Sequence, residues 1–294
     1  MKENGLFTTE GVTLSNRCLH TPNCFAKQNL LYVQEVGQLK SLTPHKNERS
    51  GLDSFLFLCV TAGTGTLEVD GKQYEIKKGD CALLNCMQPY SHISSAQDHW
   101  ELAWVHFNGT IAKAYFDFFY QSNQDENVVF GTETRQWQSI VTSLLETQKS
   151  KSIMAELESG ELLLHLLNCL VGAAIKSNTL TEDTDGTWYK EIRELINERY
   201  ADPSLMDDLT SRFGLSVELL DRRFQKQFGI GLQEYIDNRR LNAAKELLRF
   251  SIIPVEDVAQ KSGLGDTDIM QQIFLENENM SAQEYRSKWA QWIK

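Results

Sequence analysis

Two stretches in the last third of the chain share one layout, and this duplication constrains the fold more than any other feature. Residues 205–228 predict a short helix, a tight turn at Gly214 and a second helix. Residues 255–277 repeat the arrangement, with the turn at Gly263, and a longer helix at about 232–249 joins the two. Short helix, tight turn and second helix form a helix-turn-helix, whose second helix enters the major groove of DNA. Two such units in tandem favour DNA binding far more than one alone.

Everything after Trp188 is expected to be helical, with Pro and Gly residues at the joints. The expected helices are 188–200, 205–213, 217–227, 232–249, 255–261, 267–277 and 281–291. Ser216 and Asp266 each precede a helix as N-cap residues. The polar, acidic segment Asn178–Thr187 is expected to be a linker. The predicted domains are therefore 1–177 and 188–294, with a linker at 178–187.

The first hundred or so residues predict strands, because short runs of branched and aromatic residues alternate with turn residues. The expected strands are Leu30–Val36, Phe55–Thr61, Thr66–Val69, Gln73–Ile76, Cys81–Leu84 and Leu102–Phe107. Many short strands at regular spacing indicate a sandwich or small barrel. Apolar residues then follow helical spacing in 134–148 and 153–176. The predicted fold class is α+β, with a barrel and two helices before an all-α domain.

Composition narrows the class of protein further. The chain carries a net charge of −11 with a pI near 5.1, so any surface that binds nucleic acid must be local. Met1–Thr9 lacks the apolar segment of a signal peptide, and Leu162–Ile175 is too short to span a bilayer, so we expect a cytoplasmic protein without a membrane partner. The six cysteines are scattered and are expected to be reduced structural thiols, although a redox role for Cys81 and Cys86 stays open.

Residues 188–294 resemble the DNA-binding domain of the AraC/XylS family of transcription regulators. Matches to the first half of the family pattern are Ser216, Leu220, Arg222, Phe224, Gly229, Tyr235, Arg240, Ala244, Leu247 and Leu248. Matches to the second half are Val258, Ala259, Gly263, Asp266, Phe274, Ser281, Tyr285 and Arg286. The pattern extends over about a hundred residues, and the resemblance implies that this domain binds DNA.

The second unit departs from the family pattern in its basic residues. The family usually has Phe-Lys-Lys where this chain has Phe274-Leu275-Glu276, and Phe, Gly and Pro where it has Leu264, Asn279 and Ala282. Its expected recognition helix, 267–277, contains no Lys or Arg. Carboxylates near phosphates repel, so we expect the first unit to supply most of the affinity for DNA.

Helical spacing selects the residues that are expected to face DNA. Leu220 and Phe224 lie four residues apart and should face the core, so Glu218, Asp221 and Arg222 should point outward. An arginine pairs with guanine, a carboxylate accepts from cytosine, and a glutamine pairs with adenine. The predicted DNA-binding residues are Ser216, Glu218, Asp221, Arg222, Lys226, Asp268, Gln271 and Gln272. For the acidic residues, a purely solvated role remains an equal alternative.

The strand-rich half resembles the cupin-like effector-binding domain that precedes this DNA-binding domain in many such regulators. The matching residues are His45, Gly63–Gly65, Gly71, Gly79-Asp80, Pro89–His92 and Trp104–Gly109. The resemblance implies a small-molecule pocket in the barrel. The predicted effector-binding residues are Tyr32, His45, Arg49, Trp104 and His106, and Arg49 favours an anionic or sugar-like effector. For each of them a packing or surface role is the alternative.

We expect no enzyme, cofactor or metal site. The cupin metal pattern needs a His-x-His pair, a Glu and a further His, and of these only His92 fits. No nucleophile lies beside a base. The expected partners are double-stranded DNA, the effector, RNA polymerase and a second copy of the chain, since the family resemblance implies that helices 134–148 and 153–176 form a homodimer contact. Two alternatives stay open: a regulator-like protein with weakened DNA binding that acts by hetero-association, and a cupin enzyme.

Overall fold

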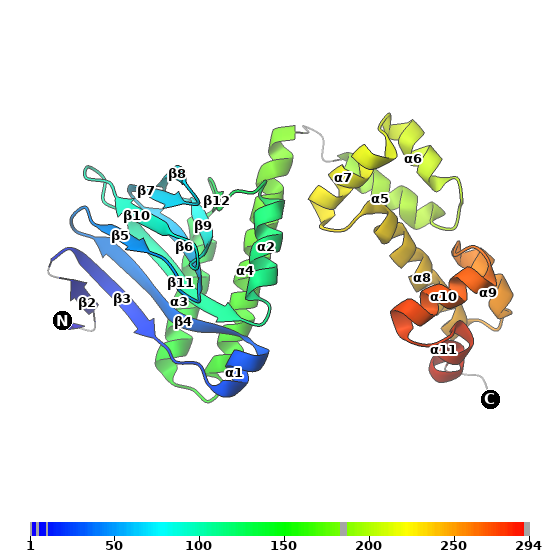
Figure 1. Ribbon diagram of the computed structural model, residues 1–294, viewed down its shortest axis with the longest axis horizontal. Helices are drawn as coiled ribbons and strands as arrows, with labels where there is room; N and C mark the ends of the chain where they lie inside the picture. The colour runs from blue at the N-terminus through cyan, green and yellow to red at the C-terminus, as the bar shows by residue number, and fades with distance from the viewer. Residues whose placement is uncertain (1, 4–5, 10, 183–186, 291–294) are drawn as a thin grey trace. The chain divides into compact units, whose positions relative to one another are not determined.

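The computed structural model describes residues 2–3, 6–9, 11–182 and 187–290 (Figure 1). The chain divides into two compact units, with the boundary after Glu182. The N-terminal unit contains all the described strands, and the C-terminal unit consists of helices.

Two antiparallel sheets build the N-terminal unit. The first sheet has eight strands in the order β1-β2-β3-β4-β11-β6-β9-β12 and the second has four in the order β5-β10-β7-β8. The strands of the first sheet are β1 (Lys2–Glu3), β2 (Leu6–Thr9), β3 (Thr13–Leu19), β4 (Leu31–Ser41), β6 (Phe55–Ala62), β9 (Cys81–Asn85), β11 (Glu101–Gly109) and β12 (Val128–Val129). Those of the second are β5 (Lys46–Arg49), β7 (Thr64–Val69), β8 (Lys72–Lys77) and β10 (Tyr90–Ser94).

The position of strand β6 between two layers explains why its sequence shows no alternation of polar and apolar residues. Every residue from Phe55 to Thr61 is buried, because both faces of the strand are covered. Phe57 and Cys59 belong to a core shared with the helices, whereas Leu58 and Val60 belong to a core between the two sheets. The large sheet is therefore the middle layer of this unit.

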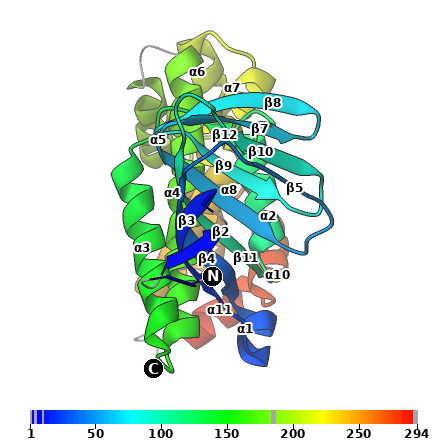
Figure 2. The same ribbon diagram turned by 90° about the vertical axis from the view of Figure 1, so that its left-hand side faces the viewer.

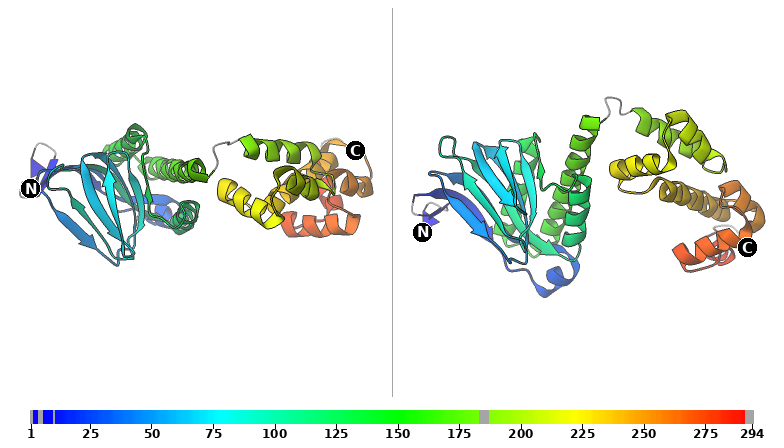
Figure 3. Two further views of the ribbon diagram at one scale, coloured as in Figure 1. Left: turned by 90° about the horizontal axis from the view of Figure 1, so that it is seen from above. Right: turned by 45° about the horizontal axis from the view of Figure 1, so that its top comes forward.

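Helices cover the outer face of the large sheet. They are α1 (Cys24–Asn29), α2 (Ala112–Ser122), α3 (Thr134–Ser150) and α4 (Ala155–Glu182). Figures 1 and 3 show α2, α3 and α4 on one side of the sheets, and Figure 2 shows α3 running alongside the strands. By length and composition alone the segment Ala155–Ser177 could cross a membrane. However, Leu163, Leu166 and Leu170 of this segment are fully buried against the sheet and its neighbouring helices.

The C-terminal unit is all α-helical and holds the two predicted helix-turn-helix units. Its helices are α5 (Thr187–Arg199), α6 (Leu205–Phe213), α7 (Val217–Phe228), α8 (Leu232–Phe250), α9 (Val255–Ser262), α10 (Thr267–Glu278) and α11 (Ala282–Trp289). Gly214 and Gly263 end α6 and α9 with φ of 64° and 75°, a left-handed conformation that glycine adopts without strain.

Each helix-turn-helix unit has its own hydrophobic core, and α8 contributes to both. Ile236 packs in the core of α6 and α7, whereas Leu241, Ala244 and Leu248 pack in the core of α9 and α10. Leu220 and Phe224 occupy the same places in the first unit as Met270 and Phe274 occupy in the second, and all four are fully buried. The two helix-turn-helix units therefore share the same arrangement of buried residues as well as the same order of helices.

The predicted fold class is confirmed, and all six predicted strands and all nine predicted helices are present, although β4 and α4 extend to Ser41 and Glu182, beyond their predicted ends at 36 and 176. The predicted linker begins too early, at Asn178, because α4 continues to Glu182. The rest of that segment, up to the start of α5 at Thr187, lies outside the described residues. Several elements were not predicted individually: the strands before Leu19, β5, β10, β12, α1 and α2.

A substitution at Gly65 of β7 tests how tightly the two sheets pack. A Cβ atom there would lie 2.2 Å from the ring of Trp100 and 2.5 Å from the carbonyl oxygen of Ile93. Gly65→Ala should therefore lower the free energy of unfolding of the N-terminal unit by about 1–3 kcal/mol in urea titrations. Gly172→Ala in α4 is the matched control, because a Cβ there meets open space and should raise stability by about 0.5–1 kcal/mol. Equal effects of the two substitutions would contradict this account.

Candidate functional site

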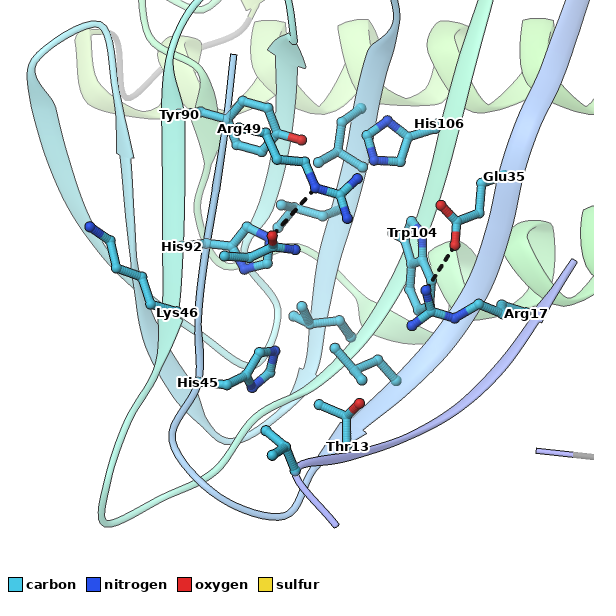
Figure 4. A pocket seen from close by; sticks show the side chains of 16 residues that line it. Thr13, Arg17, Glu35, His45, Lys46, Arg49, Tyr90, His92, Trp104 and His106 are labelled. Atoms are coloured by element: carbon cyan, nitrogen blue, oxygen red, sulfur yellow. Dashed lines mark hydrogen bonds and ion pairs between the residues drawn. The ribbon is translucent and has the colours of Figure 1, made fainter. Parts of the chain in front are cut away.

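A cavity of about 350 Å³ lies between the two sheets of the N-terminal unit (Figure 4). Strands β3, β4, β6 and β11 of the large sheet form one wall, and β5 with β10 of the small sheet forms the other. Its volume is at the lower end of the range for small-molecule sites. The lining residues are Val12, Thr13, Arg17, Glu35, Leu39, His45, Lys46, Asn47, Arg49, Leu56, Leu58, Tyr90, His92, Leu102, Trp104 and His106.

One wall of the cavity carries an ion pair above an aromatic ring. Arg17 Nη1 donates to Glu35 Oε1 at 3.0 Å, and both side chains are half-buried. The Arg17 guanidinium carbon lies 5.2 Å from the centre of the Trp104 ring, within the range of a cation–π contact. The carboxylate of Glu35 is therefore neutralised by its neighbour, and Trp104 is fixed between a cation and the sheet.

The opposite wall presents Arg49 from β5. Its Nε donates to Asn47 Oδ1 at 3.3 Å, and within the described part of the chain no carboxylate pairs with it. Asn47 and Arg49 alternate with the exposed Lys46 and Glu48, which pair with each other at 2.8 Å. The alternation of β5 thus directs an arginine without a counter-ion into the cavity.

Three imidazoles complete the polar lining (Figure 4). His106 Nδ1 lies 3.1 Å from Ser54 Oγ, and His45 Nδ1 lies 3.4 Å from Ser41 Oγ. His92 is packed between Tyr90 and Trp100, with ring centroids at 6.4 and 5.6 Å.

The protonated form is disfavoured at all three histidines. Burial, together with the neighbouring His45, Arg49 and His106, lowers the pKa of His92 to about 4. Burial and the charge of Arg49 likewise bring the pKa of His106 to about 4. Burial also lowers the pKa of His45. At neutral pH the empty cavity therefore holds neutral imidazoles beside a cationic guanidinium.

Four of the five predicted effector residues line this cavity: His45, Arg49, Trp104 and His106. Tyr32 does not. It pairs with Asn108, beyond a β-bulge at His106–Phe107, where burial and the nearby Asp53 carboxylate raise the pKa of its hydroxyl.

Sequence reasoning missed Arg17, Glu35, Tyr90 and His92 as lining residues. Arg17 lies on β3 and Tyr90 and His92 lie on β10, strands that were not predicted. Glu35 lies on the predicted strand β4, but its partner Arg17 on β3 was not foreseen. His92 and His106 lie on different strands but line one cavity, whereas His99 bonds the carbonyl of Ser95 at 2.7 Å. Among the described residues, no cluster of three or more His, Cys, Asp or Glu side chains could hold a metal ion.

The first helix-turn-helix unit presents Arg222 on the outer face of α7, with no carboxylate partner among the residues that the structure describes. Ser216 caps the helix by accepting from Leu219 N at 3.3 Å. Glu218 and Arg222 are exposed, as predicted from helical spacing. The pKa of the Glu218 carboxyl is lowered by hydrogen bonds from its own backbone N–H and from Ser216. The side chain of Lys226 lies outside the described residues.

Asp221 does not point outward as predicted. Its Oδ1 accepts from the backbone N–H of Leu232 at 2.7 Å, and its side chain is half-buried. Leu232 is the first residue of α8, so Asp221 satisfies one of the free N–H groups at that helix start. The expectation that Asp221 faces base edges rested on spacing within α7 alone, which says nothing about the approach of α8.

The second unit repeats this contact with a different residue. Gln271 Oε1 accepts from the backbone N–H of Ala282, the first residue of α11, at 2.9 Å. Gln272 and Asp268 are exposed, and Gln272 Nε2 donates to Glu276 at 2.9 Å. The exposed face of α10 is therefore acidic and amide-bearing, as its sequence predicted, but Gln271 is turned toward α11.

These features define a class: a ligand-binding domain built from two sheets, followed by a double helix-turn-helix domain. The family description "AraC-like ligand binding domain" matches residues 32–167, and "Helix-turn-helix domain" matches residues 209–288. The chain belongs to the AraC/XylS family of regulators.

Individual relatives are distant. The chain is 30% identical over 145 residues to the uncharacterized HTH-type transcriptional regulator YijO of Escherichia coli strain K12, which covers 49% of this chain and 50% of YijO. It is 24% identical over 236 residues to the lactose operon transcription activator of Staphylococcus xylosus, covering 77% of this chain and 81% of that protein. Among solved structures, apo ToxT from Vibrio cholerae aligns with 95% of this chain and 98% of its own, at 12% identity and a TM-score of 0.33.

The buried imidazoles predict a pH dependence of stability. A histidine titrates near pH 6.5 in the unfolded chain, whereas His92 and His106 titrate near 4 in the fold. The unfolded state therefore binds more protons between these values, and stability is lost as pH falls from about 6.5 to about 4. The slope should reach at most ~1.4 kcal/mol per pH unit for each imidazole.

Urea titrations between pH 7 and pH 4.5 measure this slope. His92→Phe should reduce it, whereas His165→Gln, which replaces an exposed histidine of α4, should leave it unchanged. A slope that His92→Phe does not alter would contradict the assignment.

The helix cap at Asp221 gives a second stability prediction. Asp221→Ala should lower the free energy of unfolding of the C-terminal unit by about 1 kcal/mol, because the N–H of Leu232 loses its acceptor. Arg222→Ala, at the adjacent exposed position, should change it by less than about 0.5 kcal/mol. Denaturant titration of both variants distinguishes the cap from a surface carboxylate.

Proposed function

We propose that this protein is a sequence-specific DNA-binding transcription regulator controlled by a small molecule that binds in the cavity between the sheets. The observation that carries the proposal is the pair of helix-turn-helix units, of which the first presents Arg222 without a carboxylate partner among the described residues. The domain order supports it, since the ligand-binding match precedes the helix-turn-helix match.

DNA recognition is assigned mainly to α7. Arg222 pairs with guanine in the major groove, and Glu218 accepts from cytosine. Ser216 and Lys226 contact the backbone phosphates at the two ends of the helix. In the second unit Gln272 reads adenine after releasing Glu276, and Asp268 lies beside it at the start of α10. Asp221 and Gln271 contribute by fixing the next helix, and base contact by either requires that this cap first be broken.

The effector is a small sugar-like or anionic molecule. The lining combines hydrogen-bonding groups with the aromatic face of Trp104 and the leucines Leu56 and Leu58, which suits a compact, partly polar ligand. The similarity to a lactose operon activator is consistent with the sugar-like alternative. Tyr32 takes part only through a rearrangement of its strand, since it does not line the cavity.

Control requires that the effector favour one arrangement of the protein over another. The protein acts in the cytoplasm as a homodimer through α3 and α4, and the effector changes how the paired DNA-binding domains engage adjacent half-sites. RNA polymerase is the partner that converts this change into altered transcription.

Binding of the purified chain to promoter fragments near its own gene tests the proposal. We expect a sequence-preferring complex at low salt, and Arg222→Ala should weaken it about 10- to 100-fold, the effect of losing one bidentate base contact. Lys113→Ala in α2 removes the same charge from an exposed site in the other unit and should leave affinity unchanged.

Two results would count against the assignment. The absence of any sequence-preferring complex would favour the alternative of a regulator-like protein that acts by hetero-association. An Arg222→Ala variant with full affinity would exclude α7 as the principal reading helix.

A further inference from the structure

The charges that face the cavity do not balance. Glu35 is the one carboxylate among the residues that line it, and Arg17 neutralises it at 3.0 Å. Lys46 lies at the rim and pairs with Glu48 outside. Arg49 is then left without a counter-ion in the described structure, on the wall opposite the ion pair. A guanidinium that faces a cavity without a carboxylate partner can bind a ligand that supplies the negative charge.

A second, independent feature points into the same space. His92 is 8% exposed, and its Nδ1 is buried with no hydrogen-bond partner within the described residues. An unpaired buried polar atom destabilises the fold, so its presence calls for an explanation. His106, also 8% exposed, uses Nδ1 toward Ser54 and keeps Nε2 for another partner. Figure 4 shows both imidazoles and the Arg49 guanidinium around one space.

We propose that the effector is an organic anion whose carboxylate or other oxyanion group binds between Arg49, His92 and His106, and that the cavity takes up a proton when the anion enters. This inference rests on the proposed function only for the identification of the cavity as the effector site. Arg49 supplies the planar pair of N–H donors that oxyanions prefer, and the protonated imidazole supplies a further charged donor.

The direction of the proton transfer follows from the surroundings of the imidazoles. Burial and Arg49 keep both histidines neutral in the empty cavity. The other titratable groups that face them are Glu35 on β4, His45 before β5 and Tyr90 on β10, with Arg17 held by Glu35. An anion beside Arg49 cancels the charge that disfavours protonation and adds attraction to an imidazolium. The bound state therefore binds more protons than the free state, and affinity for the anion rises as pH falls.

The rest of the lining indicates that the anion carries an organic body. Leu56, Leu58 and Leu102 contribute apolar lining, together with the part of the Trp104 ring that Arg17 and the sheet leave accessible. A free inorganic ion would fill little of the 350 Å³ and would leave this surface uncovered. A ring or short chain with one oxyanion group matches both parts of the cavity.

The test compares pairs of ligands in which a carboxylate replaces a neutral hydroxymethyl group, using isothermal titration calorimetry on the full-length chain. The probes are galacturonate against galactose and benzoate against benzyl alcohol, at pH 8.0, 7.0 and 6.0, where both acids stay ionised. We expect at least one anion to bind ten-fold or more tightly than its neutral partner. Its affinity should rise by up to about ten-fold per pH unit, the limit for uptake of one proton. Repeating the titration in buffers of different ionisation enthalpy counts the proton directly.

Variants assign the roles. Arg49→Met should abolish anion binding at every pH, and Arg49→Lys should recover part of it. His92→Phe should flatten the pH dependence while some Arg49-dependent affinity remains. Lys113→Met, an exposed cation of α2 far in sequence from the site, is the control and should bind as the unaltered chain does. Thermal melts establish that each variant is folded.

Three results would overturn the inference: equal binding of a neutral partner, anion affinity independent of pH, or no binding by either anion. None of them depends on DNA. A protein that binds the anion with proton uptake but forms no sequence-preferring DNA complex would contradict the proposed function and leave this inference standing. A protein that forms a sequence-preferring DNA complex but does not bind the anion with proton uptake would contradict only this inference.

Discussion

The burial of the large sheet on both faces is the constraint on which the rest of the N-terminal unit depends. Along β11, Trp104 and His106 face the cavity, while Ala103 and Val105 between them pack against the helical layer. The residues that would touch an effector and those that support α3 and α4 therefore alternate on one strand. Because interiors are close-packed, a shift of Trp104 on ligand binding would be felt by the helices on the other face. The fold places a ligand site and a candidate dimer surface on opposite sides of one layer.

The C-terminal unit uses the same type of contact twice to fix one helix against the next. In each half, one residue of the second helix reaches across to the start of the next helix: Asp221 to Leu232 and Gln271 to Ala282. These contacts fix the angle of the following helix and satisfy an N–H that would otherwise lack a partner. The neighbouring residues Arg222 and Gln272 are then left on the outer face. The packing is conserved between the halves while the outward chemistry differs, basic in one and acidic in the other.

Sequence reasoning located the elements well where one pattern determined them. The helices of the C-terminal unit followed from periodicity and caps, because Ser216 and Asp266 cap their helices as local rules require. The cavity was half predicted, since Arg49 and His106 were found but Arg17 and Glu35 were not. These two meet through the pairing of β3 with β4, a long-range contact that no local pattern encodes. The prediction that Asp221 points outward was wrong for the same reason, since its partner Leu232 belongs to another helix.

The cavity combines two departures from the rule that buried polar and charged groups find partners. Elsewhere in the same unit, Gln148 donates to Ser159 at 2.7 Å, and Asn127 donates to the carbonyl of Leu83 at 3.0 Å. Outside the cavity lining, Gln34 Oε1 and Trp100 Nε1 also lack a partner among the described residues. At the cavity, Arg49 lacks a counter-ion and His92 Nδ1 lacks a partner within the described structure. Placing a carboxylate beside Arg49 would have stabilised the empty fold. Its absence leaves Arg49 available to a negatively charged ligand, and under the proposed assignment the stability given up in the free protein is regained as affinity when that ligand binds.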